Sequence, residues 1–144
     1  MSDNISGDMN RYQDAAVMRD LLREAKTIAI VGLSSNPARD SHEIGVYLQG
    51  HGYRIVPVNP NERAVLGETS YPSLTAIPFP VDIVDVFRRS DAVAPIAEEA
   101  VQIGAKAIWL QLGVISQQGA SIAEQGGLKV VMDRCIMVEH RRLM

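Results

Sequence analysis

Residues 27–49 read TIAIVGLSSNPARDSHEIGVYLQ, and this stretch decides the fold. Its first five residues are mostly apolar or β-branched and show no polar alternation, which is typical of a strand buried on both faces of a parallel sheet. The run ends at Gly32 and passes into a loop rich in small and turn-forming residues. A helix is predicted over residues 42–49, closed by Gly50. A strand, a glycine-led loop and a helix in this order predict one unit of an α/β domain.

The same alternation continues along the chain. Further strands are predicted at residues 53–58, 69–71, 81–87, 106–112 and 128–132, and helices at residues 12–25, 73–76, 92–104 and 116–125. Residues 133–144 fit neither pattern clearly. Strands that alternate with helices in this way predict the α/β class, as a Rossmann-like, doubly wound, mainly parallel sheet of five or six strands with helices on both faces.

Length and composition predict a single folded domain. The chain has 144 residues, of which 47% are hydrophobic and 22% are charged, and this balance is that of a globular protein. Residues 1–10 are polar and lack periodicity, so we expect a flexible tail there and one domain over residues 11–144.

Charge and cysteine content exclude several classes of protein. The net charge of −3 lacks the basic excess typical of nucleic-acid-binding proteins. Cys135 is the only cysteine, so neither an internal disulfide nor a cysteine-rich zinc site is expected. The polar N-terminus does not resemble a targeting peptide, and no apolar run approaches the ~20 residues that span a bilayer. We therefore expect a soluble, cytoplasmic protein without nucleic-acid or membrane partners.

The loop after the first strand is the leading candidate for a ligand site. In doubly wound sheets, ligands bind at the carboxyl ends of the strands where the strand order reverses. Here Gly32 permits a sharp turn, serine hydroxyls supply donors, and the N-terminus of the next helix favours an anion. Arg39 adds a guanidinium suited to phosphate oxygens. In the alternative interpretation Asp40 or Ser41 merely caps the helix, and Arg39 is a solvated surface residue.

The loop does not fit a nicotinamide dinucleotide well. The dinucleotide fingerprint requires three glycines, of which only Gly32 is present, and an acidic residue at the end of the second strand. That second position is taken by Asn59 and Pro60. Asn59 can hydrogen-bond a base or sugar and Pro60 can pack on a flat ring, but the pair can equally form a plain turn.

Several motifs together resemble the stand-alone CoA-binding domain family, which is similar to the CoA-binding Rossmann domain of the succinyl-CoA synthetase α subunit. They are VGLSSNPARDS (31–41), VPVNP (56–60), DVFRR (85–89), WLQLG (109–113) and MDRC (132–135). The resemblance extends over residues 25–143, and the motifs follow one another in the family's order.

The resemblance implies that coenzyme A, or an acyl-CoA, is held at the carboxyl edge of the sheet. The loop would hold the phosphates, the end of the second strand would border the adenosine, and the end of the fourth strand would face the crevice. The implied CoA-binding residues are Gly32, Ser34, Ser35, Pro37, Arg39, Ser41, Val58, Asn59, Pro60, Phe87 and Arg88. The missing acidic residue agrees with this ligand, because a carboxylate would repel the 3′-phosphate of CoA.

Other residues leave alternatives open. Cys135 is either a thiol near the ligand or a small buried side chain. Asp133 and His140 suggest an acid–base pair, although a surface ion pair with the Arg141–Arg142 end of the chain is the simpler interpretation. Trp109 fits a buried strand, and Gln111 either points into the crevice or satisfies backbone groups. The sequence identifies no catalytic residue and no metal ligand.

Three functions remain at this point. The first is a CoA-binding or acyl-CoA-binding protein that acts as a sensor, carrier or regulatory module and signals to an unidentified protein partner. The second is an enzyme that uses the same crevice, either a small NAD(P)-dependent oxidoreductase or a CoA-dependent acyltransferase. The third is a degenerate Rossmann module that binds a protein and no nucleotide. Because the family's ligase subunits rely on a further domain with a phosphorylated histidine, the resemblance implies no synthetase activity for residues 1–144.

Overall fold

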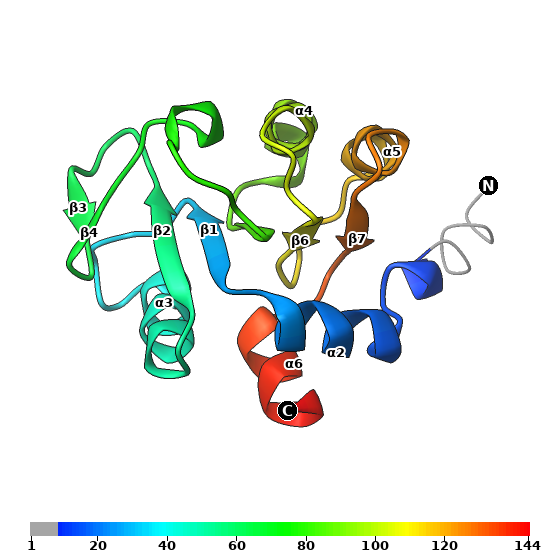
Figure 1. Cartoon of the computed structure of the whole chain (residues 1–144), viewed down its shortest axis with the longest axis horizontal. Helices are drawn as coiled ribbons and strands as arrows, with labels where there is room; N and C mark the ends of the chain where they lie inside the picture. The colour runs from blue at the N-terminus through cyan, green and yellow to red at the C-terminus, as the bar shows by residue number, and fades with distance from the viewer. Residues whose placement is uncertain (1–8) are drawn as a thin grey trace.

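The computed structural model describes residues 9–144, and its centre is a five-stranded parallel sheet (Figure 1). The strands lie in the order β2-β1-β5-β6-β7. Their bounds are β1 Thr27–Val31, β2 Arg54–Val58, β5 Ile83–Val86, β6 Ala107–Leu110 and β7 Lys129–Val131. This architecture confirms the predicted α/β class and the Rossmann-like parallel sheet.

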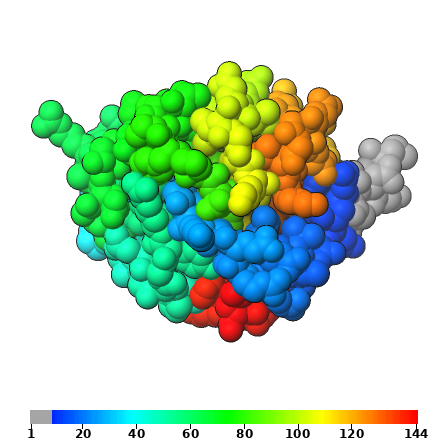
Figure 2. Space-filling model, viewed as in Figure 1, coloured from blue at the N-terminus to red at the C-terminus, as the bar shows by residue number. Residues whose placement is uncertain are grey.

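Helices cover both faces of the sheet, as Figure 1 shows. The helices are α2 Ala15–Glu24, α3 Asp40–Gly50, α4 Val93–Gln102, α5 Gln117–Gln125 and α6 Ile136–Leu143, with short 3₁₀ turns η1 Leu74–Ala76 and η2 Ser90–Ala92. Helices α4 and α5 lie side by side on one face, whereas α2, α3 and α6 lie on the other (Figure 1). Figure 2 shows the same view as a space-filling surface, with the yellow and orange segments that contain α4 and α5 above the blue and red segments that contain α2 and α6.

The strand order reverses between β1 and β5. From β1 the chain passes through α3 to β2 at one edge, and it then returns to β5 on the other side of β1. From β5 it proceeds through α4 to β6, and then through α5 to β7. The loops that follow β1 and β5 therefore leave the sheet in opposite directions, and a crevice opens between them.

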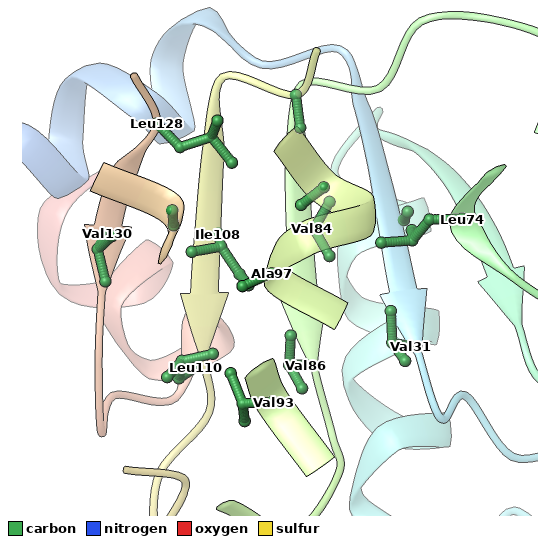
Figure 3. Close-up of a cluster of buried hydrophobic side chains, with 14 of the residues drawn as sticks. Val31, Leu74, Val84, Val86, Val93, Ala97, Ile108, Leu110, Leu128 and Val130 are labelled. Carbon is green, nitrogen blue, oxygen red and sulfur yellow. The ribbon is translucent and has the colours of Figure 1, made fainter. Parts of the chain in front are cut away.

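Alternating side chains build two hydrophobic cores. Because successive strand residues point to opposite faces, Ala29 and Val31 pack under α4 and α5, whereas Ile28 and Ile30 pack under α2, α3 and α6. Figure 3 shows the first of these cores, with Val84 and Ile108 from neighbouring strands meeting Ala97 of α4. Trp109 is fully buried in the second core, as the sequence predicts for a strand residue.

Two elements differ from the prediction. Residues 64–69 form a small antiparallel hairpin, β3 Ala64–Val65 and β4 Glu68–Thr69, where the sequence predicted a single strand over residues 69–71. The C-terminal segment forms α6, which the sequence left unassigned. Of the predicted flexible tail, residues 1–8 lie outside the described residues, and residues 9 and 10 begin a helical turn.

The outer strands are covered by segments of the chain itself. The backbone N–H of Met132 donates to the carbonyl oxygen of Tyr12, so the segment before α2 runs along the end of β7. At the opposite edge, Tyr71 forms a bridge with Val58 of β2.

Among the described residues, no helix has both the length and the apolar character needed to cross a bilayer.

Candidate functional site

A polar pocket opens where the loops after β1 and β5 part. We call it the first pocket; its volume is about 480 Å³. It is lined by Gly32, Ser34, Ala38, Arg39, Asp40, Ser41, Asn59 and Phe87. Six of these eight residues belong to the set that the family resemblance implies, so the structure brings most of the predicted site together.

A second pocket continues from the first along the carboxyl edge of the sheet. Its volume is about 490 Å³, and it shares Asp40 and Phe87 with the first pocket. Its remaining lining residues are Glu43, Ile44, Arg88, Gln111, Leu112, Val114, Cys135, Met137 and Val138. The two pockets therefore adjoin at Asp40 and Phe87, and together, from the end of β2 to the start of α6, we call them the groove.

Gly32 makes the narrow start of the groove possible. Its φ is +93°, a conformation that side-chain-bearing residues rarely adopt. A Cβ atom placed on Gly32 would lie 2.7 Å from the carbonyl oxygen of Phe87 and 3.4 Å from Cδ of Arg88. The β1 and β5 loops thus approach one another through the space that the missing side chain leaves.

The loop after Gly32 is held by its own polar side chains. The backbone N–H of Ser34 donates to Ser41 Oγ (3.1 Å), and that of Asn36 donates to Ser34 Oγ (3.0 Å). Both hydroxyl groups act here as acceptors, so each keeps its proton for a ligand. Helix α3 begins at Asp40 without a side-chain cap, which leaves its first backbone N–H groups directed at the first pocket. The capping alternative for Asp40 and Ser41 is therefore wrong.

Two arginines supply uncommitted positive charge. Arg39 lines the first pocket and Arg88 the second. Within residues 9–144 neither forms an ion pair, whereas the neighbouring Arg89 pairs with Asp91 at 3.3 Å. Exposed guanidinium groups without a carboxylate partner can bind phosphate oxygens without first breaking an existing ion pair.

A carboxylate that is absent from the predicted set of site residues reaches the loop. Glu62 Oε2 accepts hydrogen bonds from the backbone N–H (3.0 Å) and from Oγ (2.6 Å) of Ser35. These bonds lower the pKa of Glu62 below its ordinary value. The donors of Ser35, which the resemblance assigns to CoA, are therefore engaged by Glu62 in this structure. The separation of 27 residues gives no local sequence signal for this contact.

The residues at the end of β2 contribute fewer free side chains to the pocket than the family resemblance implies. Both polar atoms of the Asn59 side chain serve the chain itself, because Nδ2 donates to the carbonyl of Leu33 (3.1 Å) and Oδ1 accepts from the N–H of Asn61 (3.0 Å). Val58 is buried in the core under α4 and α5, and its side chain does not line the groove. Pro37 and Pro60 are exposed beside the first pocket and outside its lining.

Gln111 both faces the crevice and satisfies a backbone group, which are the two alternatives that the sequence left open. Its side-chain oxygen accepts the backbone N–H of Ile136 at the start of α6 (3.0 Å), and the residue also lines the second pocket. Gln111 is only 5% exposed. The bond to Ile136 fixes which end of the amide is oxygen, so the amide nitrogen is oriented as well.

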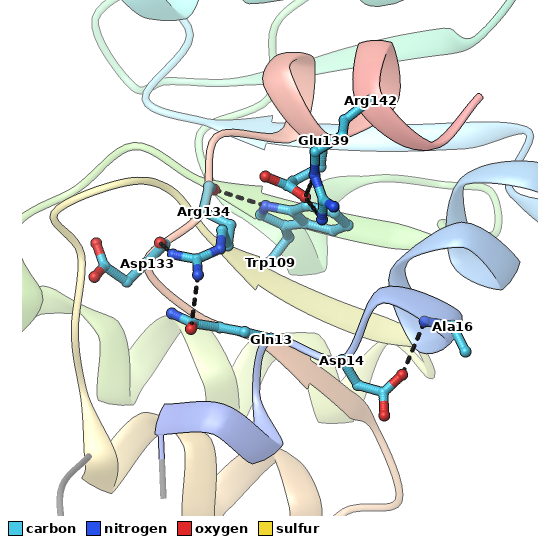
Figure 4. Close-up of polar contacts among 8 residues, drawn as sticks. All are labelled: Gln13, Asp14, Ala16, Trp109, Asp133, Arg134, Glu139 and Arg142. Atoms are coloured by element: carbon cyan, nitrogen blue, oxygen red, sulfur yellow. Dashed lines mark hydrogen bonds and ion pairs between the residues drawn. The ribbon is translucent and has the colours of Figure 1, made fainter. Parts of the chain in front are cut away.

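The loop that carries Cys135 is anchored from several sides (Figure 4). Trp109 Nε1 donates to the carbonyl of Arg134 (2.9 Å), and the Arg134 guanidinium donates to Gln13 Oε1 (2.9 Å). Asp133 Oδ1 accepts from the N–H of Gly113 (2.7 Å), which ties the β6 and β7 loops together. Cys135, half-buried, therefore lines the second pocket from a fixed backbone.

Asp133 and His140 do not form an acid–base pair. The Nδ1 atom of His140 lies 2.7 Å from the Tyr47 hydroxyl, between α6 and α3. Burial, followed by the nearby His51, lowers the pKa of His140. Within residues 9–144 no ion pair joins Asp133 to Arg141 or Arg142, and Arg142 pairs with Glu139 instead, so the predicted surface ion pair is also wrong. His140 is 9% exposed and docks α6 onto α3.

Asp85 is a second carboxyl group that the sequence analysis did not single out for chemistry. It lies in the middle of β5 between Ile30 and Trp109, two residues before Phe87 and therefore on the same face of the sheet. It is fully buried, and neither carboxyl oxygen has a hydrogen-bond partner among the described residues. Burial raises the pKa of Asp85 well above its ordinary value, because desolvation disfavours the charged form.

Residues 9–144 contain no group of three or more histidine, cysteine or acidic side chains arranged to hold a metal ion. The groove offers hydroxyl groups, backbone N–H groups, guanidinium groups and apolar side chains, together with the carboxylates of Asp40 and Glu43. Such a set suits an elongated ligand with phosphates at one end and an uncharged chain at the other.

Comparison with known proteins agrees with this description. The model of a family described as a CoA binding domain matches residues 26–141. Protein YneT of Bacillus subtilis (strain 168) is 40% identical over 125 residues, which cover 87% of this chain and 93% of YneT. A structure of a hypothetical protein from Pyrococcus horikoshii OT3 is 38% identical with a TM-score of 0.88, covering 90% of this chain and 92% of that one.

A larger relative matches through one part of its length. The protein named acetate–CoA ligase (ADP-forming) II from Archaeoglobus fulgidus is 30% identical over 109 residues. These residues cover 74% of this chain and 16% of the ligase. The chain is thus similar to one domain-sized part of that protein.

Proposed function

The chain belongs to the CoA-binding domain family, and from this premise we propose that it binds coenzyme A or an acyl-CoA in the groove formed by the two pockets. The observation that carries the proposal is the first pocket, where Arg39, the uncapped start of α3 and the Ser34 and Ser41 hydroxyls converge. In this assignment the protein acts as a sensor, carrier or regulatory module and supplies no catalytic residue.

The residues of the groove fit the charge distribution of CoA. The N–H groups at the start of α3 and the Arg39 guanidinium face the first pocket, which suits the diphosphate. Gly32 lets a ligand approach the backbone between the β1 and β5 loops. The side-chain stem of Arg88 lies against Gly32, which places its guanidinium on the second pocket side of the same crevice.

A nicotinamide dinucleotide fits less well. Its ribose hydroxyls need an acceptor at the end of the second strand, where an acidic residue normally stands. In this chain that position is Asn59, and both polar atoms of its side chain already bond to the chain itself. The 3′-phosphate of CoA needs no such acceptor and gains from the absence of a carboxylate there.

Isothermal titration of the purified chain with CoA, dephospho-CoA, NAD and NADP tests the proposal. We expect CoA to bind, and dephospho-CoA to bind about tenfold more weakly or worse, which is ~1.4 kcal/mol. The difference in affinity between CoA and dephospho-CoA should decrease as the salt concentration is raised, because the loops are exposed and salt screens their charges. No binding of any of the four at millimolar concentration would contradict the proposal and favour a module that recognises a protein. Tighter binding of NAD or NADP would favour the oxidoreductase alternative.

An Arg39→Ala variant tests the location of the site. Arg39 is exposed and makes no side-chain bond within the described chain, so its removal should leave the free energy of unfolding nearly unchanged. The affinity for CoA should fall by about 1.5–3 kcal/mol, the scale of hydrogen bonds to charged groups. Arg19→Ala, which removes an exposed arginine from α2, is the matched control. Equal affinities of the two variants for CoA would show that Arg39 is a solvated surface residue that does not contact the ligand.

A further inference from the structure

We propose that the second pocket holds the acyl thioester of an acyl-CoA, and that the Gln111 amide nitrogen donates a hydrogen bond to the thioester carbonyl oxygen. This inference rests on the proposed function and makes it more specific, because it names acyl-CoA rather than free CoA as the preferred ligand. It is carried by the lining of the second pocket and by the hydrogen bonding of Gln111.

The charges of the second pocket disfavour phosphate. Asp40 and Glu43 both line it, against the single positive charge of Arg88. Phosphate groups are therefore better placed in the first pocket, beside Arg39 and the start of α3. Because the two pockets meet at Asp40 and Phe87, a ligand anchored by its phosphates in the first pocket extends into the second with its uncharged end.

Apolar side chains form most of the remaining wall. The pocket is bounded by Ile44, Phe87, Leu112, Val114, Met137 and Val138. Leu112 is 68% exposed and Val138 is 47% exposed, although both are aliphatic. An acyl chain lying against them would remove this apolar surface from water.

Gln111 supplies the polar group that a carbonyl oxygen needs. Its own oxygen is bonded to the N–H of Ile136, so the orientation of the amide is set by the start of α6. The amide nitrogen donates to no other residue within 9–144 and, unlike the Asp85 oxygens, it is not fully buried. A donor held in this way, beside a mainly apolar wall whose carboxylates disfavour an anion, suits an uncharged acceptor such as a thioester carbonyl.

A pair of ligands isolates this hydrogen bond. Acetyl-CoA and S-ethyl-CoA have the same chain length and differ in having a carbonyl or a methylene next to sulfur. We expect the wild-type chain to bind acetyl-CoA about three- to tenfold more tightly than S-ethyl-CoA, the net value of one hydrogen bond. Equal affinities, with both ligands bound, would overturn the inference and leave the proposed function intact. Failure of free CoA to bind would instead count against the proposed function.

Gln111→Glu provides the matching change in the protein. Glutamate keeps the oxygen that Ile136 uses and replaces the amide nitrogen by a second acceptor, so the preference for acetyl-CoA over S-ethyl-CoA should fall to one or below. Gln118→Glu, at an exposed position of α5, makes the same charge change outside the pocket and should keep the preference. Because each preference is a ratio within one variant, a general change in CoA affinity cancels. A preference that survives Gln111→Glu would overturn the assignment of Gln111, and the ligand pair in the wild-type chain tests the pocket even if this variant fails to fold.

The exposed apolar side chains of the second pocket lead to a separate prediction about the length of the acyl chain. Hexanoyl-CoA should bind more tightly than acetyl-CoA, by up to about fourfold for each methylene that is fully buried. Leu112→Ser should reduce this gain, whereas Ile115→Ser, which alters a neighbouring exposed aliphatic residue outside the pocket lining, should not. An unchanged gain in the Leu112 variant, or none in the wild type, would contradict an acyl site between β6 and α6.

Discussion

The Glu62 carboxylate engages the donors of Ser35, a residue that the family resemblance assigns to CoA. Its Oε2 atom takes both the N–H and the hydroxyl of Ser35, which are the kinds of donors that a phosphate-binding loop offers. Glu62 belongs to the turn after β2, and its backbone N–H donates to the carbonyl of Asn59. The structure thus shows the loop after β1 with part of its donor capacity engaged by the chain itself.

Glu62→Gln should therefore strengthen binding of CoA. The substitution keeps the shape of the side chain and removes a negative charge that opposes the phosphates, so we expect affinity to rise about two- to tenfold at low ionic strength and less at high salt. Titration calorimetry on the variant, with Glu98→Gln on the exposed surface of α4 as the control, measures this. A weaker affinity in the Glu62 variant would show that the carboxylate holds the loop in its binding conformation.

Asp85 shows the opposite situation, a carboxyl group whose pKa is raised by burial. It is fully buried beneath the groove, and neither oxygen has a partner among the described residues. The unfolded chain ionises this group near its ordinary pKa of about 3.9, whereas burial raises the pKa in the folded state. The folded state therefore binds more protons than the unfolded state between the two pKa values, and stability falls as pH rises through that window.

Asp85→Asn should remove this pH dependence. Asparagine is neutral at every pH, so the variant should gain stability relative to wild type as pH increases from 5 to 8, by up to about 1.4 kcal/mol per pH unit while the folded acid stays protonated. Urea unfolding of both proteins at a series of pH values gives the difference, in which the titration of all other groups cancels. Parallel stability curves would mean that Asp85 ionises in the folded protein near its ordinary pKa.

At the scale of elements, the strands that form the sheet were predictable because their signals are local. The strand over residues 27–31 and the predicted strands at 53–58, 81–87, 106–112 and 128–132 correspond to β1, β2, β5, β6 and β7, each a short apolar run. Strands β3 and β4 have two residues each, which is too short for a pattern of alternation to show.

Helix α6 was harder to predict because its buried face contains polar residues. Glu139 is 5% exposed and pairs with Arg142 at 2.6 Å, and His140 meets the Tyr47 hydroxyl. Hydrophobic periodicity cannot register side chains that are buried through such partners. Helix α6 matters for the site because its first residue, Ile136, orients Gln111, so the sequence indicated the first pocket far better than the second.

Gly32 and Gly52 form a matched pair for testing the junction between the β1 and β5 loops. Both have φ near +90°, namely +93° and +91°, but a Cβ on Gly52 would meet open space. Gly52→Ala should cost only the backbone strain, about 1–2 kcal/mol. Gly32→Ala adds a contact of 2.7 Å with the Phe87 carbonyl oxygen, so it should cost at least ~1 kcal/mol more and should also weaken CoA binding.

Denaturant unfolding and CoA titration of the two alanine variants measure these effects. The difference between the variants isolates the contact of the two loops, because the backbone strain is shared. Equal losses of stability, with CoA affinity unchanged in both, would show that the loops separate without cost.

At the scale of the whole molecule, the doubly wound topology determines where the ligand can bind. The chain turns from β1 to β2 on one side and from β5 to β7 on the other, and both pockets lie above this reversal. The sequence predicted the reversal from its alternating strands and helices. It could not predict the engagement of Ser35 by Glu62 or the orientation of Gln111 by Ile136, because contacts 27 and 25 residues apart depend on the assembled fold.

The whole-molecule comparison also predicts what a polypeptide of these 144 residues does not catalyse. The chain matches 16% of the length of the acetate–CoA ligase (ADP-forming) II of Archaeoglobus fulgidus. Acyl-CoA formation coupled to a nucleotide needs a site that positions the transferred phosphoryl group, in addition to a CoA site. The groove described above has one set of phosphate-binding features, at the start of α3, and the proposed function assigns it to CoA. His140, whose Nδ1 atom lies against the Tyr47 hydroxyl under α3, is not placed to carry a phosphoryl group to the groove.

Incubation of the chain with acetate, CoA, magnesium and ATP should therefore release no ADP, AMP or acetyl-CoA above the enzyme-free background. A turnover that disappears in a His140→Ala variant, with the fold intact, would contradict this and would make His140 a catalytic residue.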